Sequence, residues 1–369
     1  MEQSAPGVPA GARPSARFVW GLCALLLVHH FGLWAWTAWH RGFPLLAGLD
    51  HWDSGHYSTL VTRGYATPLW AFLPLYPLTV KLVSGALGGG VPPQVLGCVL
   101  STGLLVAFVA WVHQRASRRE VLSPLEPRTR WGWFFFLFSP ASFALHSHHT
   151  EALFLLLSLG AFACAWEGHF WRAAVFAGLC VWTRNQGVFV AIVAALLLAE
   201  RVPGSARQRL LRFAGLGFLS LAAYGGMILF EWRASGDPLA HLHSQSSWPH
   251  VDSAWGALRT LWLGNPHQDW DRWEIPRALF SFLLLGGSLA LARVNRPLGL
   301  YGVLSFAVML PQGEFANALR FGAVLFPVLF LLGDALAARP AWLRWSVAIL
   351  AFWANHKITH GFVNGFWAY

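Results

Sequence analysis

Two carboxylates lie beside aromatic residues in the first polar stretch of the chain. Residues 49–57 read LDHWDSGHY, so Asp50 and Asp53 are three positions apart, with His56 and Tyr57 directly after them. A carboxylate that is partly removed from water has a raised pKa and can take a proton from a hydroxyl group. The same carboxylates can instead cap a short helix next to an aromatic belt. From these residues alone, general-base catalysis and helix capping both remain open.

A second polar cluster, residues 146–151, reads HSHHTE and comes directly before an apolar run. Imidazole and carboxylate groups are ligands that zinc or manganese accepts, and His148, His149 and Glu151 are the residues that would bind such an ion. The spacing matches no strong metal signature, and a polar cap over the helix ends is the alternative. We therefore expect no required cofactor, with a divalent metal at these residues as an option.

Two arginines lie inside or at the mouth of apolar stretches. Arg184 interrupts two apolar runs in the sequence TRNQG, and Arg320 follows Asn317 at the start of another run. A cation at membrane depth is costly, so it usually faces a cavity or a partner. A lipid phosphate could be that partner, through paired hydrogen bonds. Snorkelling, or a structural ion pair with Glu314 or Glu151, is the alternative.

The elements that must position these residues are repeated apolar blocks. The chain has 369 residues, of which 56% are hydrophobic and 11% charged, and this composition excludes an ordinary soluble domain. Blocks such as 18–39, 95–113 and 213–232 approach the roughly 20 residues of a spanning helix. The sequence therefore predicts an all-α, polytopic membrane protein.

The net charge of +10 does not indicate a nucleic-acid partner, because the arginines form short clusters between apolar blocks, as the positive-inside rule describes. Residues 1–16 are rich in proline, alanine and glycine and are predicted to form a disordered cytoplasmic tail, followed by a single transmembrane domain at 17–369. The positive-inside rule makes the short, proline-containing segment 72–87 a juxtamembrane or re-entrant helix. Outer loops 40–94 and 234–274 are expected to contribute to the site. About eleven spans are predicted: 18–39, 95–113, 131–145, 152–166, 171–183, 188–198, 213–232, 275–292, 298–310, 319–336 and 342–353.

A series of motifs in a fixed order resembles the PIG-V family of membrane mannosyltransferases, related to the enzyme that adds the second mannose of the glycosylphosphatidylinositol anchor. The motifs are WD and HY at 52–57, GY at 64–65, AFLPLYP at 71–77, TEALF at 150–154, TRNQG at 183–187, GDPL at 236–239 with Gln245 and Trp248, and LRF at 319–321 before FP at 326–327. Leu73 departs from the family's AFFPLYP, and His149 replaces the tyrosine usual before Thr150. The departures, and a chain shorter than the eukaryotic enzymes, leave the acceptor open.

The resemblance implies GT-C architecture and a polyprenyl-phosphate-sugar-dependent glycosyltransferase. Such an enzyme moves a sugar, with mannose the first expectation, to a hydroxyl on a lipid-linked or protein acceptor, with inversion. Asp53 would be the catalytic base, and Arg184 and Arg320 would hold the donor phosphate. The residues expected to bind substrate are Asp50, His56, Tyr57, His148, His149, Glu151, Gln245 and Trp248.

The expected partners are the donor, the acceptor and membrane lipids. The expected location is a bacterial inner membrane with the site facing the periplasm, or the endoplasmic reticulum membrane in a eukaryote. A transporter or flippase for an anionic lipid or sugar is the alternative, with the same arginines lining a passage.

Overall fold

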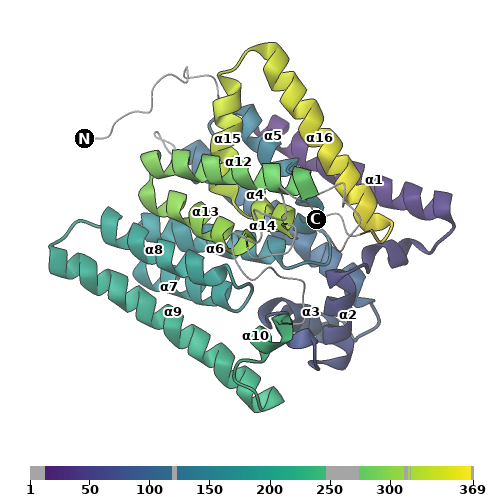
Figure 1. Ribbon diagram of the computed structural model, residues 1–369, viewed down its shortest axis with the longest axis horizontal. Coiled ribbons are helices and arrows are strands. Elements are labelled where there is room, and N and C mark those ends of the chain that lie inside the picture. Colours follow the sequence, from purple (N-terminus) through teal and green to yellow (C-terminus); the bar gives the residue numbers. More distant parts are fainter. Residues whose placement is uncertain (1–12, 119–122, 247–273, 311–314, 316, 367–369) are drawn as a thin grey trace.

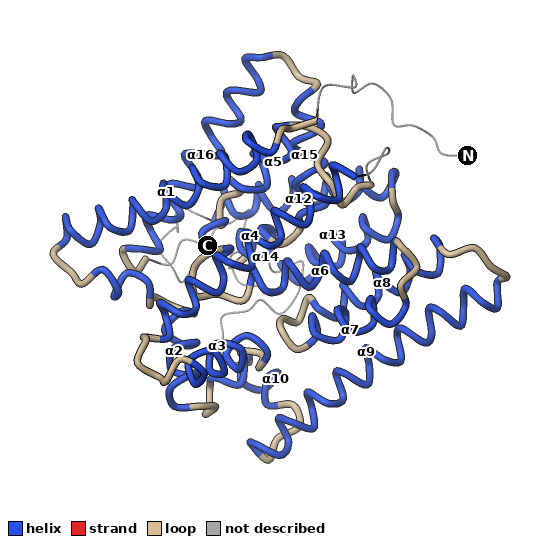
Figure 2. Tube along the Cα trace, turned by 180° about the vertical axis from the view of Figure 1, so that it is seen from behind, coloured by secondary structure: helices blue, strands red, loops and turns tan. Residues whose placement is uncertain are grey.

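The structure, a computed structural model, describes residues 13–118, 123–246, 274–310, 315 and 317–366. Within these ranges every regular element is an α-helix or a 3-10 helix, and Figure 2 shows no strand among them. The all-α prediction is confirmed for this part of the chain. Residues 1–12 of the predicted tail, Glu314, Trp248 and most of loop 234–274 lie outside the described residues.

Four helices are long and apolar enough to cross a membrane, because 20 residues at 1.5 Å per residue span the roughly 30 Å of bilayer hydrocarbon. They correspond to the predicted spans 18–39, 95–113, 213–232 and 275–292. The four are α1 (Ala16–Arg41), α4 (Pro93–Arg118), α9 (Ala206–Ser235) and α12 (Glu274–Val294). The chain is therefore a helical protein with several candidate membrane spans.

Most of the other apolar segments form helices that are shorter than a crossing, so the count of about eleven spans is not confirmed. Helix α6 (Glu151–Trp166) lies in the middle of the bundle between α4 and its neighbours (Figure 1), and nearly all of its residues are buried. A helix that is apolar all round belongs in such a core. The remaining short helices of the bundle are α7 (Phe170–Val181), α8 (Gly187–Arg201) and α13 (Arg296–Met309), and the 23-residue α16 (Ala341–Val363) runs along α1.

Two predicted spans are wrong as single helices, and a proline breaks each of them. Span 131–145 divides into α5 (Arg130–Leu137) and η3 (Ser142–Leu145), with Pro140 in the break. Span 319–336 divides into α14 (Ala318–Ala323) and α15 (Phe326–Ala337), with Pro327 in the first turn of α15. Proline lacks the N–H of a continuing helix and disfavours helical geometry in the residue before it.

The segment 72–87, predicted as a juxtamembrane or re-entrant helix, forms α3 (Leu75–Ala86). Its 12 residues extend about 18 Å, which is too short to cross a bilayer. Helix α3 packs against α2 (Asp53–Arg63) and α4. Figure 1 shows α2, α3 and the short α10 (Ala240–Gln245) together at one end of the bundle. The first outer loop therefore folds as a small helical layer on this end.

The opposite end is held together by buried charges. Arg115 of α4 pairs with Glu126 at 2.8 Å and with Glu167, just after α6, at 2.5 Å. Asp334 of α15 accepts hydrogen bonds from the backbone N–H of Thr129 and from its hydroxyl, at 2.8 and 2.7 Å, where α5 begins. These contacts join the ends of α4, α5, α6 and α15.

Most exposed tryptophans of the described helices lie near helix ends, as in the aromatic belts of membrane proteins, whereas Trp353 lies in the middle of α16. Trp36 and Trp39 lie near the end of α1, and Trp232 lies near the end of α9. A second set lies near the beginnings of helices and comprises Trp20, Trp171, Trp342 and Trp345. In the topology predicted from the sequence, the first set would fall at the outer ends of the helices and the second at the inner ends.

Candidate functional site

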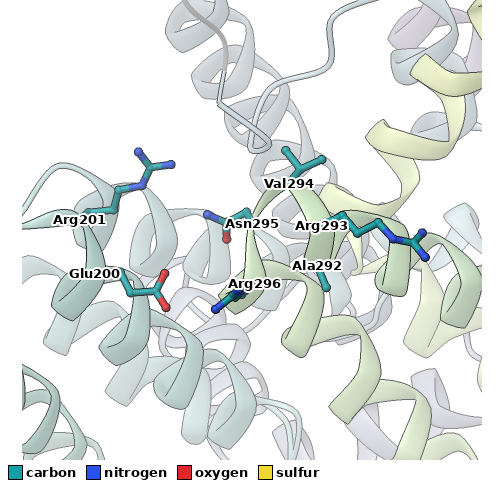
Figure 3. A pocket seen from close by; sticks show the side chains of 7 residues that line it. All are labelled: Glu200, Arg201, Ala292, Arg293, Val294, Asn295 and Arg296. Atoms are coloured by element: carbon teal, nitrogen blue, oxygen red, sulfur yellow. The ribbon is translucent and has the colours of Figure 1, made fainter. Parts of the chain in front are cut away.

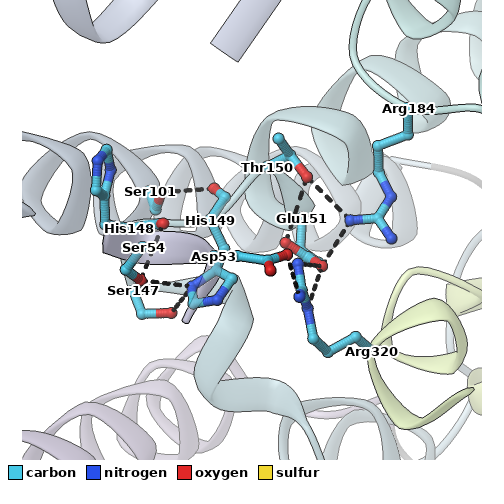
Figure 4. A network of polar contacts seen from close by, with 10 residues as sticks. All are labelled: Asp53, Ser54, Ser101, Ser147, His148, His149, Thr150, Glu151, Arg184 and Arg320. Atoms are coloured by element: carbon cyan, nitrogen blue, oxygen red, sulfur yellow. Dashed lines mark hydrogen bonds and ion pairs between the residues drawn. The ribbon is translucent and has the colours of Figure 1, made fainter. Parts of the chain in front are cut away.

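Four charged side chains from separate segments meet next to the small helical layer (Figure 4). Asp53 begins α2, Glu151 begins α6, Arg184 lies in the turn between α7 and α8, and Arg320 lies in α14. The quartet joins residues as far apart as 53 and 320. The structure thus brings the predicted base together with both predicted phosphate-binding arginines.

Arg320 lies between the two carboxylates. Its Nη1 donates to Asp53 Oδ2 at 2.6 Å, and its Nε and Nη2 lie 2.8 and 2.7 Å from Glu151 Oε1. Arg184 Nη1 donates to the same Glu151 oxygen at 2.6 Å and to the Thr150 hydroxyl at 2.9 Å. The ion pair with Glu151, one of the alternatives for these arginines, is therefore present.

The quartet is electrically balanced and largely buried. Glu151 is fully buried, the side chains of Arg320 and Arg184 are 4% and 8% exposed, and that of Asp53 is 29% exposed. Buried charges persist only when they are paired and hydrogen-bonded, and two carboxylates with two guanidinium groups satisfy that requirement. Asp53 is the member of the quartet most open to an incoming molecule.

Local backbone features direct the two carboxylates. Asp53 and Glu151 each lie in the first turn of a helix, where the helix dipole stabilises negative charge. The positive-φ residues other than glycine in the described chain are Trp52, Phe315 and Asn317. Trp52 directly precedes Asp53, and the other two precede the helix that carries Arg320. Such conformations are unfavourable for large side chains and concentrate at functional sites.

The charge of Arg320 determines the protonation of Asp53. Burial alone would raise the pKa of Asp53, but the guanidinium of Arg320 at 2.6 Å outweighs it and lowers the pKa below its ordinary value. The sequence-based expectation of a raised pKa is therefore wrong, because that reasoning included desolvation but no counter-charge.

The lowered pKa of Asp53 predicts how activity depends on pH. A base with a lowered pKa is already ionised at neutral pH, so raising the pH does not create more of it. Any activity that depends on Asp53 is expected to be level between about pH 5 and pH 8 and to fall only in stronger acid. Initial rates in constant-ionic-strength buffers test this, with protein stability followed at each pH. A rate that rises across this range would mean that another group acts as the base.

His148 and His149 are buried and bonded to hydroxyl groups. His148 Nδ1 lies 2.9 Å from the Tyr76 hydroxyl. His149 Nδ1 lies 2.7 Å from the Ser147 hydroxyl and 3.4 Å from that of Ser54. Both histidines thereby hold residues 146–151 against α2, α3 and α4. Tyr76 was not predicted as a site residue, although it lies within the AFLPLYP motif.

A metal at His148, His149 and Glu151 remains a prediction. In the described ranges, no three or more His, Cys, Asp or Glu side chains are arranged to hold a metal ion. Glu151 directs one carboxylate oxygen at the two arginines rather than at the histidine rings. The observed contacts of the cluster are thus those of a hydrogen-bonded support.

Gly97 of α4 is required by this packing, because a Cβ at that position would overlap the ring of His148. The ring is buried and bonded to Tyr76, so it has little freedom to move. We expect Gly97→Ala to destabilise the protein by about 1–3 kcal/mol, as overpacking does. Gly103→Ala is the matched control on the same helix, since nothing lies within 4 Å of its added Cβ. Thermal unfolding of both variants tests this expectation, and equal melting temperatures would contradict it.

The other predicted substrate residues make their observed contacts with residues outside the quartet. Asp50 Oδ1 accepts a hydrogen bond from the Ser58 hydroxyl at 2.5 Å, which ties the residue to α2, and no side chain caps the first turn of that helix, so the capping alternative is not seen. Tyr57 is buried, with its ring 5.1 Å from that of Tyr76, and His56 is exposed beside Phe72. Gln245 ends α10, and Trp248 lies outside the described residues.

Helix α10 is fastened to α9 by a buried pair. His241 Nδ1 lies 2.7 Å from Glu231 Oε2, and its Nε2 lies 3.2 Å from the Tyr224 hydroxyl. Helix α10 also packs on η2 (Leu69–Ala71), which belongs to the first outer loop. The part of loop 234–274 that is described is therefore held against the helical layer that carries Asp53.

A cavity of about 340 Å³ lies away from the quartet, where the end of α8 meets the turn between α12 and α13 (Figure 3). Its lining residues are Glu200, Arg201, Ala292, Arg293, Val294, Asn295 and Arg296. Glu200 is 13 residues after Gly187, at the far end of α8, or about 20 Å along the helix. The cavity therefore contains none of the candidate site residues.

Comparison with known sequences supports the family resemblance. Residues 38–200 match a family described as mannosyltransferase (PIG-V), and this range contains Asp53, Glu151 and Arg184. GPI alpha-1,6-mannosyltransferase 2 of Cricetulus griseus is 26% identical over 152 residues, which cover 39% of this chain and 30% of the relative. The resemblance to PIG-V mannosyltransferases is confirmed for this region, and it supports glycosyltransferase activity.

Comparison with solved structures concerns the fold. The apo oligosaccharyltransferase of Archaeoglobus fulgidus matches 96% of this chain with a TM-score of 0.51 and 14% sequence identity. The chain covers 57% of that structure. The expected GT-C architecture is therefore confirmed, although the matched relatives are considerably longer than the aligned region.

Proposed function

We propose that this chain is an inverting glycosyltransferase that moves mannose from a polyprenyl-phosphate donor to a hydroxyl of a lipid-linked or protein acceptor. The observation that carries the proposal is the quartet, in which a partly exposed carboxylate is paired with one buried arginine and is linked through Glu151 to a second. A base for an acceptor and cations for a phosphate are the two requirements of this transfer.

Asp53 removes the proton of the acceptor hydroxyl. Its Oδ2 is bonded to Arg320, while its Oδ1 takes part in none of the hydrogen bonds seen in the described residues. As Oδ1 takes the proton, the acceptor oxygen attacks the anomeric carbon. The bond from that carbon to the phosphate oxygen breaks, and the polyprenyl phosphate leaves with the electron pair.

The two arginines hold the phosphate in different ways. Arg320 uses Nε, Nη1 and Nη2 on the carboxylates, whereas the bonds of Arg184 to Glu151 and Thr150 use Nη1. Arg184 thus retains Nε and Nη2 for a paired contact with the donor phosphate. Arg320 holds Asp53 in place and adds positive charge as the phosphate leaves.

Glu151 positions the arginines and does not contact the acceptor itself. The carboxylate is fully buried and bonded to both guanidinium groups. His148 and His149 hold the segment that carries it, through Tyr76, Ser147 and Ser54. The sequence predicted that Glu151, His148 and His149 bind substrate. Positioning the arginines is a more specific role for them.

The reaction takes place at the non-cytoplasmic membrane face, which is the periplasmic side of a bacterial inner membrane or the lumenal side in a eukaryote. The quartet includes Asp53, which lies in the polar segment that follows α1. The positive-inside rule assigns this segment to the outer side. Lipid-linked donors and acceptors reach the site from the membrane.

The test is a transfer assay with the purified full chain in detergent. The protein is incubated with radiolabelled polyprenyl-phosphate mannose and a membrane-lipid extract, alongside heat-inactivated protein. Label in a new lipid or protein band is the expected result. No transfer from this donor or from its glucose counterpart, with folded protein, would overturn the proposal. A lipid-flipping assay in vesicles would then test the transporter alternative.

A further inference from the structure

Gln186 has a buried side chain whose polar atoms have no partner. The residue is 2% exposed, and neither Oε1 nor Nε2 makes a hydrogen bond. Among the neighbouring buried side chains, Thr150 and Glu151 accept hydrogen bonds from Arg184, and Thr183 donates to the carbonyl of Leu179 at 2.7 Å, whereas Nε2 of His148 also lacks a partner. An orphaned buried amide is rare and requires an explanation, most of all in a membrane bundle.

The backbone around Gln186 does not explain the orphaned amide. The carbonyl of Gln186 accepts from the N–H groups of Phe189 and Val190, at 3.0 and 3.2 Å, as α8 begins. The turn is held to α3 by the bond from Leu75 N–H to the carbonyl of Trp182, at 3.0 Å. These backbone hydrogen bonds do not involve the side-chain amide, whose two polar atoms remain without a partner.

The position of Gln186 places it close to the proposed phosphate site. It follows Arg184 by two residues, so their Cα atoms are at most about 7 Å apart. Arg184 itself points at Glu151 and Thr150 (Figure 4). A sugar attached to a phosphate on Arg184 is within the range of a side chain on the same turn.

The hydrogen-bonding groups of the Gln186 amide indicate which kind of ligand can pair with it. Oε1 can only accept a hydrogen bond, and Nε2 can only donate. A ligand that pairs with both atoms must therefore offer a donor and an acceptor, as hydroxyl groups do. The phosphate diester of the donor only accepts, so it cannot satisfy both atoms.

We infer that Gln186 binds hydroxyl groups of the donor sugar and contributes to sugar selection, separately from the arginines that bind the phosphate. This inference rests on the proposed function. The empty protein keeps the amide unpaired, and the arriving sugar completes its hydrogen bonds. Gln186 lies in the TRNQG motif but was not among the predicted site residues.

The experiment compares two lipids on the full chain in detergent: polyprenyl-phosphate mannose and polyprenyl phosphate without a sugar, with the same polyprenyl chain. Binding is measured by thermophoresis for the wild type and for Gln186→Met, which has a similar volume and no hydrogen-bonding group. We expect the variant to bind the mannose lipid about tenfold more weakly and the bare phosphate lipid equally well. Gln114→Met, an exposed residue far along α4, is the matched control.

Thermal unfolding without ligand separates this role from a structural one. Removing an unsatisfied buried amide should leave the empty protein at least as stable as the wild type. A lower melting temperature with unchanged mannose-lipid affinity would mean that a buried water satisfies the amide, and would overturn the inference. Wild-type protein that binds neither lipid would instead overturn the proposed function, and this assignment with it.

Discussion

Replacing Asp53 with asparagine is expected to lower sugar transfer by a factor of about 10² to 10⁴, the usual contribution of a general base. Asparagine has the same shape, and its carbonyl can still accept the hydrogen bond from Arg320 that Oδ2 accepts at 2.6 Å. The amide cannot take a proton from the acceptor, so the acceptor oxygen must attack with its proton in place. The loss is expected in kcat, because donor binding depends on the arginines.

The measurement is the initial rate of mannose transfer at saturating donor, with the melting temperature of each protein recorded. Glu200→Gln is the control, because it makes the same change from carboxylate to amide at the far end of α8. The control is expected to retain full activity. A folded Asp53→Asn protein with wild-type turnover would remove Asp53 from the mechanism and leave it a structural partner of Arg320.

Replacing Glu151 with glutamine is expected to destabilise the protein by about 3 kcal/mol, within the usual cost of breaking a buried ion pair. Glu151 Oε1 accepts hydrogen bonds from Arg184 and Arg320 with no exposure to solvent. Without the charge, Arg184 loses its carboxylate partner and Arg320 keeps only Asp53. Donor affinity should fall as well, because both arginines lose the group that positions them.

Glu126→Gln provides the matched control for Glu151→Gln. Glu126 is also buried and paired with an arginine, Arg115, at 2.8 Å, but at the opposite end of the bundle. Both variants should melt at lower temperature, while only Glu151→Gln should weaken the binding of polyprenyl phosphate. Equal donor affinity in the two folded variants would reduce Glu151 to a structural residue.

The sequence by itself determined the membrane character and the long helices. Blocks 18–39, 95–113, 213–232 and 275–292 correspond to α1, α4, α9 and α12, because the length of an apolar run is a local property with a direct physical meaning in a bilayer. It also indicated α3 as a short helix, since the segment is brief and contains two prolines. The motifs identified Asp53, Glu151, Arg184 and Arg320 as residues of interest.

The number of membrane spans could not be predicted from the lengths of the apolar runs. Helices α6 and α8 have 16 and 15 residues and are mostly buried inside the bundle, and an apolar core helix and a short membrane span have similar sequences. The breaks at Pro140 and Pro327 depend on local geometry within apolar runs that otherwise look continuous.

Only the tertiary structure decided how the candidate residues are paired. The sequence left Arg320 with a phosphate, Glu314 or Glu151 as its partner, and folding placed its side chain on Asp53 at the start of α2 and on Glu151 at the start of α6. The folded arrangement also lowers the pKa of Asp53, gives His148 and His149 hydroxyl partners, and leaves the side-chain amide of Gln186 without a hydrogen-bond partner. The physical reason is that hydropathy and spacing act along the chain, whereas ion pairs and hydrogen bonds depend on distances between segments that meet only after folding.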